Sequence, residues 1–173
     1  MNDYKILFTG TMGAGKTTAI GAISEIAPLN TDVHNNDLSV LKAMTTVGLD
    51  YGEVTLEGGE KIRLYGTPGQ QRFDFMWQIL SKGALGLIML IDNSRPDPLA
   101  DLDMYLEGFA DLIARTGCVV AVGKTESHPT PDLDAFAARM QAKGVLSPVV
   151  ATDVRDPQQV LQLLDLLLLQ LEL

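Results

Sequence analysis

The segment Gly10-Thr11-Met12-Gly13-Ala14-Gly15-Lys16-Thr17 constrains this chain more than any other feature of it. It fits the pattern G-x-x-x-x-G-K-[ST], in which glycines let backbone N–H groups curl around phosphate oxygens. An apolar run over Lys5 to Thr9 precedes it, and a helix-forming segment through about Glu25 follows. The positive end of that helix favours the same anion. The sequence therefore predicts a strand, a phosphate-binding loop and a helix in succession.

Short apolar runs alternate with helix-length segments along the rest of the chain. This alternation predicts one α/β domain over residues 1–173, a three-layer sandwich with a six-stranded, mostly parallel sheet. A hairpin around Gly58-Gly59 makes one edge strand antiparallel. The later strands are expected at residues 50–57, 61–65, 84–91, 118–122 and 147–151. The later helices are expected at residues 71–80 and 99–115, after Pro131 as far as Lys143, and from Asp156-Pro157 onward.

Net charge and hydropathy indicate which partners and which location to expect. The formal net charge of −9 gives no general attraction to nucleic acid, so we expect no nucleic-acid partner. No segment has the length of a membrane span, and the start of the chain does not resemble a signal peptide. We therefore expect a cytoplasmic protein with no integral membrane segment. The single cysteine, Cys118, lies in an apolar run and is expected to be buried.

Two apolar segments leave alternatives open. The leucine-rich tail from Val160 to Leu171 predicts an amphipathic helix packed on the sheet, or else a helix that binds a partner or a membrane surface. Its polar residues are neutral or acidic, which disfavours the membrane surface. Trp77, with Phe73, Phe75 and Met76, indicates either core packing under a helix or a hydrophobic surface for an effector.

The glycine-rich loop assigns roles to its own residues. The Lys16 ammonium can reach the β- and γ-phosphates of a nucleotide, and the Thr17 hydroxyl is placed to bind Mg²⁺. The residues expected to contact the nucleotide here are Gly10, Gly13, Ala14, Gly15, Lys16, Thr17 and Thr18.

The end of the polar segment at residues 28–50 adds a second motif. Thr45-Thr46-Val47-Gly48-Leu49-Asp50-Tyr51 resembles the T-I-G-V-D-F switch I of Ras-like GTPases such as the Rab proteins. The resemblance implies the P-loop NTPase fold, and it implies that Thr46 binds Mg²⁺ and the γ-phosphate. Thr45 is a neighbour that competes for this role, and Thr46 as a plain strand-entry residue remains the alternative.

A third motif resembles the family's switch II, D-T-A-G-Q-E-R-F. It is Leu64-Tyr65-Gly66-Thr67-Pro68-Gly69-Gln70-Gln71-Arg72-Phe73, within an expected switch at residues 66–80. The resemblance implies that the Gly69 N–H meets the γ-phosphate and that Gln70 orients the attacking water. The catalytic residues that it implies are Gln70, Lys16 and Thr46, and the metal ligands are Thr17 and Thr46.

Two positions depart from the family pattern. Gly66 stands where most Ras-like proteins have an Asp that holds Mg²⁺ through water, so Mg²⁺ binding is weakened or passes to another group. The same loss is found in MglA-like bacterial polarity GTPases and in actinobacterial GTPases with a G-T-P-G-Q switch, which this chain resembles. Met12 occupies a position that is often Gly, and its side chain is expected to crowd the γ-phosphate and slow hydrolysis.

The base-reading motif is the weakest of the four. Gly123-Lys124-Thr125-Glu126 lies where the family has N-K-x-D. Lys124 fits, and the Glu126 carboxylate can accept from guanine N1–H and its amino group, although it is one methylene longer than Asp. Gly123 lacks the Asn that braces the loop, and a plain turn is the alternative interpretation. Thr152 and the backbone of Asp153 fall in the S-A-K position near the base.

The resemblance implies a molecular switch that binds GTP with Mg²⁺ and hydrolyses it slowly to GDP. Its implied partners are a GTPase-activating or roadblock-fold regulator and effectors that read the two switches. Two alternatives stay open. A pseudo-GTPase scaffold is favoured by Gly66 and Met12 and disfavoured by Gln70. A small P-loop kinase or ATPase is disfavoured because the sequence has no arginine cluster.

Overall fold

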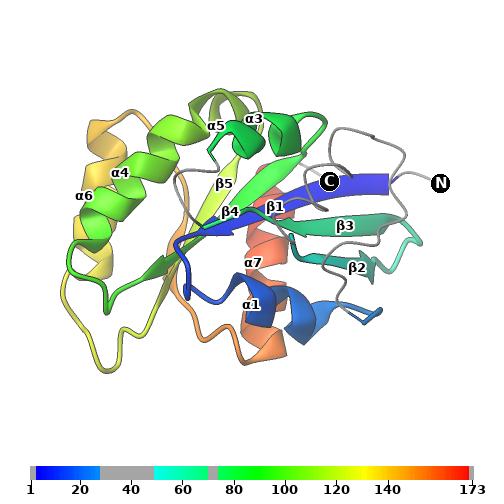
Figure 1. Ribbon diagram of the computed structural model, residues 1–173, viewed down its shortest axis with the longest axis horizontal. Helices are drawn as coiled ribbons and strands as arrows, with labels where there is room; N and C mark the ends of the chain where they lie inside the picture. Colours follow the sequence, from blue (N-terminus) through cyan, green and yellow to red (C-terminus); the bar gives the residue numbers. More distant parts are fainter. Residues whose placement is uncertain (1–2, 28–48, 70–73, 172–173) are drawn as a thin grey trace.

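The computed structural model describes residues 3–27, 49–69 and 74–171 of the chain. A six-stranded sheet runs through its centre in the order β2-β3-β1-β4-β5-β6 (Figure 1). Only β2 is antiparallel to its neighbour, as the sequence predicts. The strands are β1 (Asp3–Gly10), β2 (Tyr51–Thr55), β3 (Lys61–Gly66), β4 (Gly86–Asp92), β5 (Cys118–Gly123) and β6 (Val149–Ala151).

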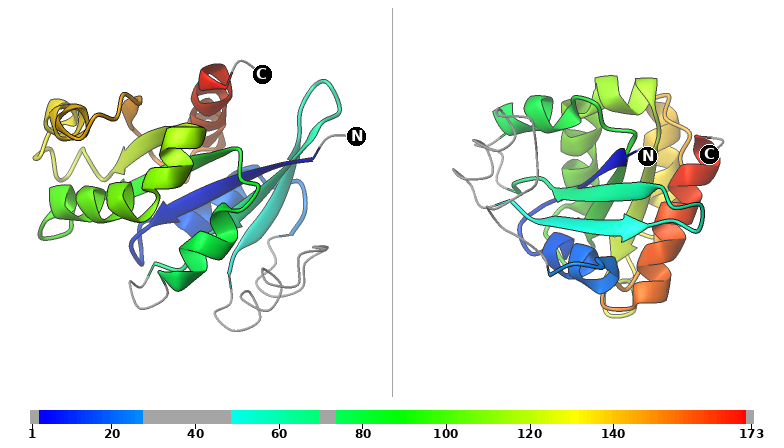
Figure 2. Two further views of the ribbon diagram at one scale, coloured as in Figure 1. Left: turned by 90° about the horizontal axis from the view of Figure 1, so that it is seen from above. Right: turned by 90° about the vertical axis from the view of Figure 1, so that its right-hand side faces the viewer.

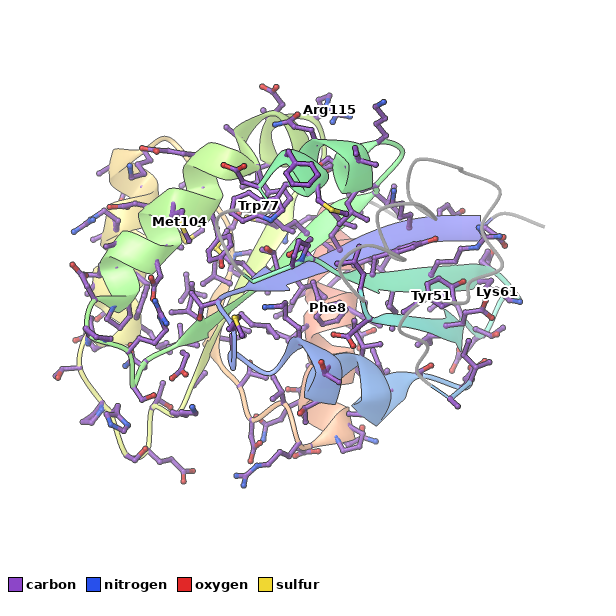
Figure 3. The ribbon with its side chains drawn as sticks, in the orientation of Figure 1. Phe8, Tyr51, Lys61, Trp77, Met104 and Arg115 are labelled. Atoms are coloured by element: carbon purple, nitrogen blue, oxygen red, sulfur yellow. The ribbon has the colours of Figure 1, made fainter. Side chains whose placement is uncertain are left out.

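Helices cover both faces of the sheet and complete the predicted three layers (Figures 1 and 2). One buried cluster joins α3, α4, α5 and α6 to the sheet and contains Trp77, whereas the other joins α1 and α7 to it and contains Phe8 (Figure 3). The helices are α1 (Lys16–Ile23), α3 (Phe75–Ser81), α4 (Pro98–Gly108), α5 (Ala110–Arg115), α6 (Leu133–Ala142) and α7 (Pro157–Gln170).

The single helix expected at residues 99–115 is wrong, because the structure divides it into α4 and α5. The break lies at Phe109, whose φ of −114° and ψ of 19° are not helical. Its ring stacks on Trp77 with 4.9 Å between centroids. A Cβ at Gly108 would overlap the same indole, so this position requires glycine, a poor helix former. Packing around Trp77 therefore overrides the helical pattern.

Three other expectations about packing are confirmed. Val160, Leu163, Leu164 and Leu167 of α7 are buried against the sheet. The helix begins as predicted, since the Asp156 side chain accepts from the Gln158 N–H. Cys118 is buried, and burial raises the pKa of its thiol. Trp77 and Met76 are core residues, as core packing under a helix predicts, whereas Phe75 is exposed and Phe73 lies outside the described residues. Among the described helices, none is long and apolar enough to cross a bilayer.

Candidate nucleotide-binding site

The loop between β1 and α1 has the shape that its glycines predict. Gly13 and Gly15 have φ values of 78° and 102°, which side chains with a Cβ rarely adopt. No side chain caps the first turn of α1, which begins at Lys16. The N–H groups of that turn are therefore left for an anion, and the helix dipole favours one there.

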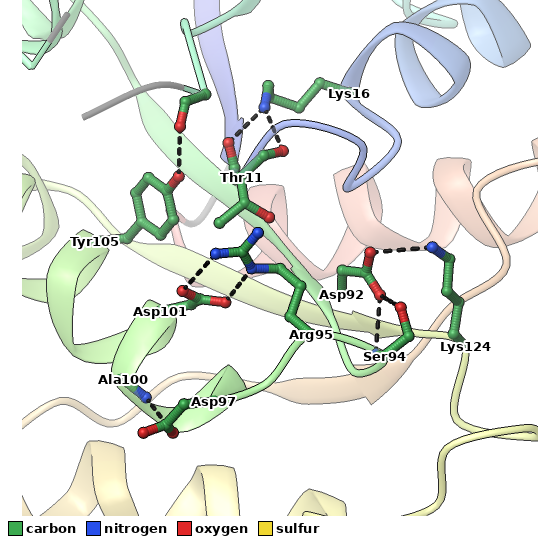
Figure 4. Close-up of polar contacts among 12 residues, drawn as sticks. Thr11, Lys16, Asp92, Ser94, Arg95, Asp97, Ala100, Asp101, Tyr105 and Lys124 are labelled. Carbon is green, nitrogen blue, oxygen red and sulfur yellow. Dashed lines mark hydrogen bonds and ion pairs between the residues drawn. The ribbon is translucent and has the colours of Figure 1, made fainter. Parts of the chain in front are cut away.

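Lys16 lies beneath this loop and is buried. Its Nζ donates to the carbonyl oxygens of Gly10 and of Thr11, the latter at 2.8 Å (Figure 4). Burial lowers the pKa of Lys16 to about 8, although the nearby Asp50 carboxylate acts in the opposite direction. The loop thus positions a cation at its centre, within reach of a phosphate bound by the backbone.

The start of the expected switch II is packed against the same loop. A Cβ added at Gly69 would lie 2.6 Å from the Met12 nitrogen and 2.9 Å from Lys16 Nζ. Thr67 ties this segment to β1, since its N–H donates to the Phe8 carbonyl at 2.9 Å. Trp77 Nε1 donates to the Pro68 carbonyl at 3.3 Å. Gly69 is therefore held beside the lysine where the motif predicts a γ-phosphate contact.

A single cleft of about 560 Å³ connects the phosphate loop to the expected base-reading loops. These segments are far apart in the sequence and meet where β1, β4, β5 and β6 end, the edge at which parallel α/β sheets bind ligands. Predicted residues that line the cleft are Gly13, Ala14, Gly15, Thr18, Lys124, Glu126, Thr152 and Asp153.

Asp92 is a cleft residue that the sequence analysis did not single out. It ends β4, and its Oδ2 accepts from Lys124 Nζ at 3.0 Å (Figure 4). Burial opposes ionisation of Asp92, but hydrogen bonds from Ser94 and Lys124 outweigh it and lower the pKa. Polar residues directly after a buried strand were the available signal, because the carboxyl ends of such strands form binding sites.

Asn93, the next residue, was also not predicted. Its side chain braces the loop that follows β5. Its Nδ2 donates to the carbonyl oxygens of His128 at 2.6 Å and Pro131 at 3.1 Å. Its own N–H donates to the Gly123 carbonyl. Asn93, directly after β4, thus makes the kind of contact for which the family pattern has an Asn at the position of Gly123.

The loop after β6 closes the base side of the cleft. Thr152 is buried, and its N–H donates to the Val122 carbonyl at 2.9 Å. The Asp153 carboxylate accepts from Arg155, which lowers the pKa of Asp153. Glu126 is exposed at the cleft wall. The predicted base-reading residues therefore lie around one space, with Arg155 as an unpredicted neighbour.

The expected metal site is described in part. Thr45, Thr46 and Gln70 lie outside the described residues. Thr17 Oγ1 donates to Asp50 Oδ2 at 2.7 Å. Within the described part of the chain, no group of three or more His, Cys, Asp or Glu could hold a metal by itself. A hydroxyl beside one carboxylate does fit Mg²⁺, which takes phosphate oxygens and water as its other ligands.

Comparison with known proteins gives distant relatives. The chain is 23% identical over 145 residues to the Ras-related protein RABA1g of Arabidopsis thaliana, covering 79% of the chain and 62% of the relative. It is 33% identical over 111 residues to Ras-related protein Rab-13 of Canis lupus familiaris, covering 62% and 49%. An uncharacterised protein of Methanocaldococcus jannaschii is 32% identical over 95 residues, or 54% of each chain. No protein-family model matches the chain.

These similarities support a relationship to the Ras-like superfamily of small GTPases. They do not support the bacterial branch that the switch II sequence indicates. The chain spans about half to three fifths of the length of these relatives. At this level of identity, GTP or GDP and Mg²⁺ are the ligands that the superfamily implies.

Proposed function

We propose that this chain is a molecular switch that binds GTP and hydrolyses it slowly to GDP. The observation that carries the proposal is the cleft itself. It joins the phosphate loop around Gly13 and Gly15 to Lys124 and Glu126 in one space of about 560 Å³. A mononucleotide needs both ends, because its phosphates and its base are separated by the ribose.

The phosphate end would bind the polyphosphate by three kinds of contact. Backbone N–H groups of the loop and of the first turn of α1 face the anion. The Lys16 ammonium exchanges the carbonyl oxygens of Gly10 and Thr11 for phosphate oxygens. Bound Mg²⁺ would neutralise charge that develops on the β- and γ-phosphates, and Thr17 with the predicted Thr46 would hold it.

Two segments would sense the γ-phosphate. Gly69 lies beside Lys16 and is anchored through Pro68 to Trp77, so a phosphate on Lys16 acts directly on the start of switch II. Gln70 comes next in the sequence, and by the motif it orients the attacking water. Hydrolysis removes the γ-phosphate and with it the contacts that order the switches at residues 28–50 and 66–80.

At the base end, Glu126 would accept from guanine N1–H and the exocyclic amino group. Adenine offers neither donor at those positions, so a well-placed Glu126 discriminates between the two bases. Asp92 holds the Lys124 side chain by a 3.0 Å bond, which aligns it along the cleft. Thr152 and the Asp153 backbone complete the base pocket in this proposal.

The remaining assignments rest on the sequence. We propose one G domain over residues 1–173 and a GTPase-activating or roadblock-fold regulator from the motifs and the family they resemble. The cytoplasmic location stays an expectation from the sequence. The bacterial branch rests on Gly66-Thr67-Pro68-Gly69-Gln70 alone. The second candidate is a pseudo-GTPase scaffold, favoured by Met12 in the phosphate loop and by Gly66 in switch II.

Single-turnover hydrolysis separates the switch from the scaffold. The protein is loaded with GTP, Mg²⁺ is added, and GDP is measured by chromatography over hours. Slow formation of GDP that is lost in Gln70→Ala supports the switch, whereas bound GTP that stays intact supports the scaffold. In parallel, the affinity for GDP is compared with the affinity for inosine diphosphate, which lacks the exocyclic amino group. Glu126→Ala should abolish any preference between the two.

A further inference from the structure

The Asp50 carboxylate lies beside the hydroxyl expected to bind magnesium. Thr17 Oγ1, in the first turn of α1, donates to Asp50 Oδ2 at 2.7 Å. Asp50 directly precedes β2 and is half-buried. Burial lowers the pKa of Lys16, and the negative charge of Asp50 acts in the opposite direction. A carboxylate from the end of the first switch is therefore fixed at the edge of the phosphate loop.

The same carboxylate fills the space next to Gly66. Tyr51 of β2 pairs with Tyr65 of β3, so the register continued by one residue places Asp50 opposite Gly66. The Gly66 N–H donates to the Asp50 carbonyl at 3.0 Å, which agrees with this placement. Side chains at directly opposite positions project from the same face of an antiparallel pair. A Cβ built on Gly66 would lie 3.1 Å from Asp50 Cβ and 3.3 Å from its Oδ2.

We propose that Asp50, directly before β2, supplies the magnesium-holding carboxylate that the Ras-like pattern places at the position of Gly66 on β3. The inference rests on the proposed function, since the ion is the one that accompanies the nucleotide. Mg²⁺ keeps several waters and is bound through one or two carboxylates together with phosphate oxygens. A carboxylate moved to the neighbouring strand still serves if it reaches the ion or its waters, and the contact with Thr17 places it there.

A purely structural role for Asp50 makes a different prediction. In that case the carboxylate only accepts the Thr17 hydrogen bond and fixes the end of β2 against α1. Asp50→Asn separates the two roles, because the amide oxygen still accepts from Thr17 while the negative charge is gone. Glu57→Gln is the matched control, since it removes one carboxylate charge from an exposed position of the β2–β3 hairpin.

The test measures magnesium binding without relying on hydrolysis. Full-length protein is loaded with a fluorescent GDP analogue in EDTA, and the dissociation rate of the analogue is followed as free Mg²⁺ is raised. We expect Asp50→Asn to need about 10- to 100-fold more Mg²⁺ for half-maximal retention of the analogue. Losses of this size are typical when a group that hydrogen-bonds to the ligands of a metal is removed. Glu57→Gln should match the parent protein, and thermal melting in EDTA should be unchanged in both.

A swap variant tests whether the two positions serve one site. Asp50→Gly alone should weaken magnesium binding, and adding Gly66→Asp should restore it, because the carboxylate returns on β3 and its crowding with Asp50 is removed. The inference about Asp50 would be overturned if Asp50→Asn had the magnesium dependence of the parent. It would also be overturned if the swap variant bound magnesium as weakly as Asp50→Gly. Either result would leave the proposed function standing. A parent protein that binds no guanine nucleotide, with or without Mg²⁺, would overturn the proposed function as well.

Discussion

The phosphate loop is tightly packed on its inner side, around Lys16 and Gly69, whereas the base end of the cleft is open. At the phosphate end, Lys16 is only 9% exposed and a Cβ at Gly69 would meet backbone atoms at 2.6 Å. At the base end, the Lys124 side chain is 52% exposed, and a Cβ at Gly123 would meet its nearest atoms at 3.7 Å. The first region keeps every fixed position of G-x-x-x-x-G-K-[ST], whereas the second departs from N-K-x-D at Gly123 and Glu126.

A motif can lose side chains and keep its geometry where other residues make the same contacts. Polyphosphate is bound mainly by backbone N–H groups in a fixed curve, so few side chains can change there. The base loop depends on side-chain contacts, and these can come from a neighbouring strand. Asn93, directly after β4, braces the loop in which Gly123 has no side chain to do so. In the same way, the Asp50 carboxylate, directly before β2, lies next to Gly66 of β3, which has no side chain of its own.

Removing the cation at the phosphate end should have the largest effect. Lys16→Ala deletes a buried charge-assisted donor to phosphate, which is worth about 3 kcal/mol, or a loss of roughly 100-fold in GDP affinity. Isothermal titration with GDP measures the change. Lys82→Ala, at an exposed position after α3, is the control and should bind like the parent. Equal affinity of the two variants would contradict the phosphate end as described.

Adding a methyl group should distinguish the tight end from the open one. Gly69→Ala places a Cβ against Met12 and Lys16 and should lower the free energy of unfolding by about 2 kcal/mol. Gly123→Ala makes only ordinary van der Waals contacts and should change it by less than about 0.5 kcal/mol. Urea denaturation of both variants checks the ranking, and the reverse order would break the comparison.

Loss of the Asn93 brace should weaken the base end selectively. Asn93→Ala removes two hydrogen bonds to the loop at residues 128–131, and GDP affinity should fall about tenfold. Inorganic pyrophosphate contacts only the phosphate end, so its affinity should stay the same. Titration with both ligands measures the two ends separately. An equal loss for both would mean that Asn93 supports the whole fold and not the base loop.

A smaller loss than at Asn93 is expected at Asp92, and it depends on pH. The pKa of Asp92 is lower in the folded protein than its ordinary value of 3.8, so its ionised form stabilises the fold. This stabilisation is fully present above the ordinary pKa and is lost as pH falls through the lowered one. Asp92→Asn removes the ion pair with the partly exposed Lys124, which should cost at most about 1 kcal/mol at neutral pH. The difference from the parent should shrink under acid. Denaturant melts at several pH values test this, and a difference that is independent of pH would contradict it.

Much of the fold could be predicted from the sequence, because strand and helix periods alternate clearly and the hairpin turn is marked by Gly58-Gly59. The break at Phe109 could not, since it depends on Trp77 packing from another helix. The phosphate loop was predictable because its residues are contiguous. Asp92 and Asn93 carry a local signal, because they follow a buried strand, but their partners could not be predicted. Those partners, like the contact between Asp50 and Thr17, depend on strand order and register that no local pattern contains.

The most direct test of a guanine-nucleotide cleft is the nucleotide that accompanies the purified protein. The parent and Lys16→Ala proteins are purified in Mg²⁺, denatured, and the released small molecules are identified and quantified by mass spectrometry. We expect GDP or GTP at close to one molecule per parent chain and little in Lys16→Ala. Adenine nucleotides in its place, or equal amounts in both proteins, would contradict this expectation.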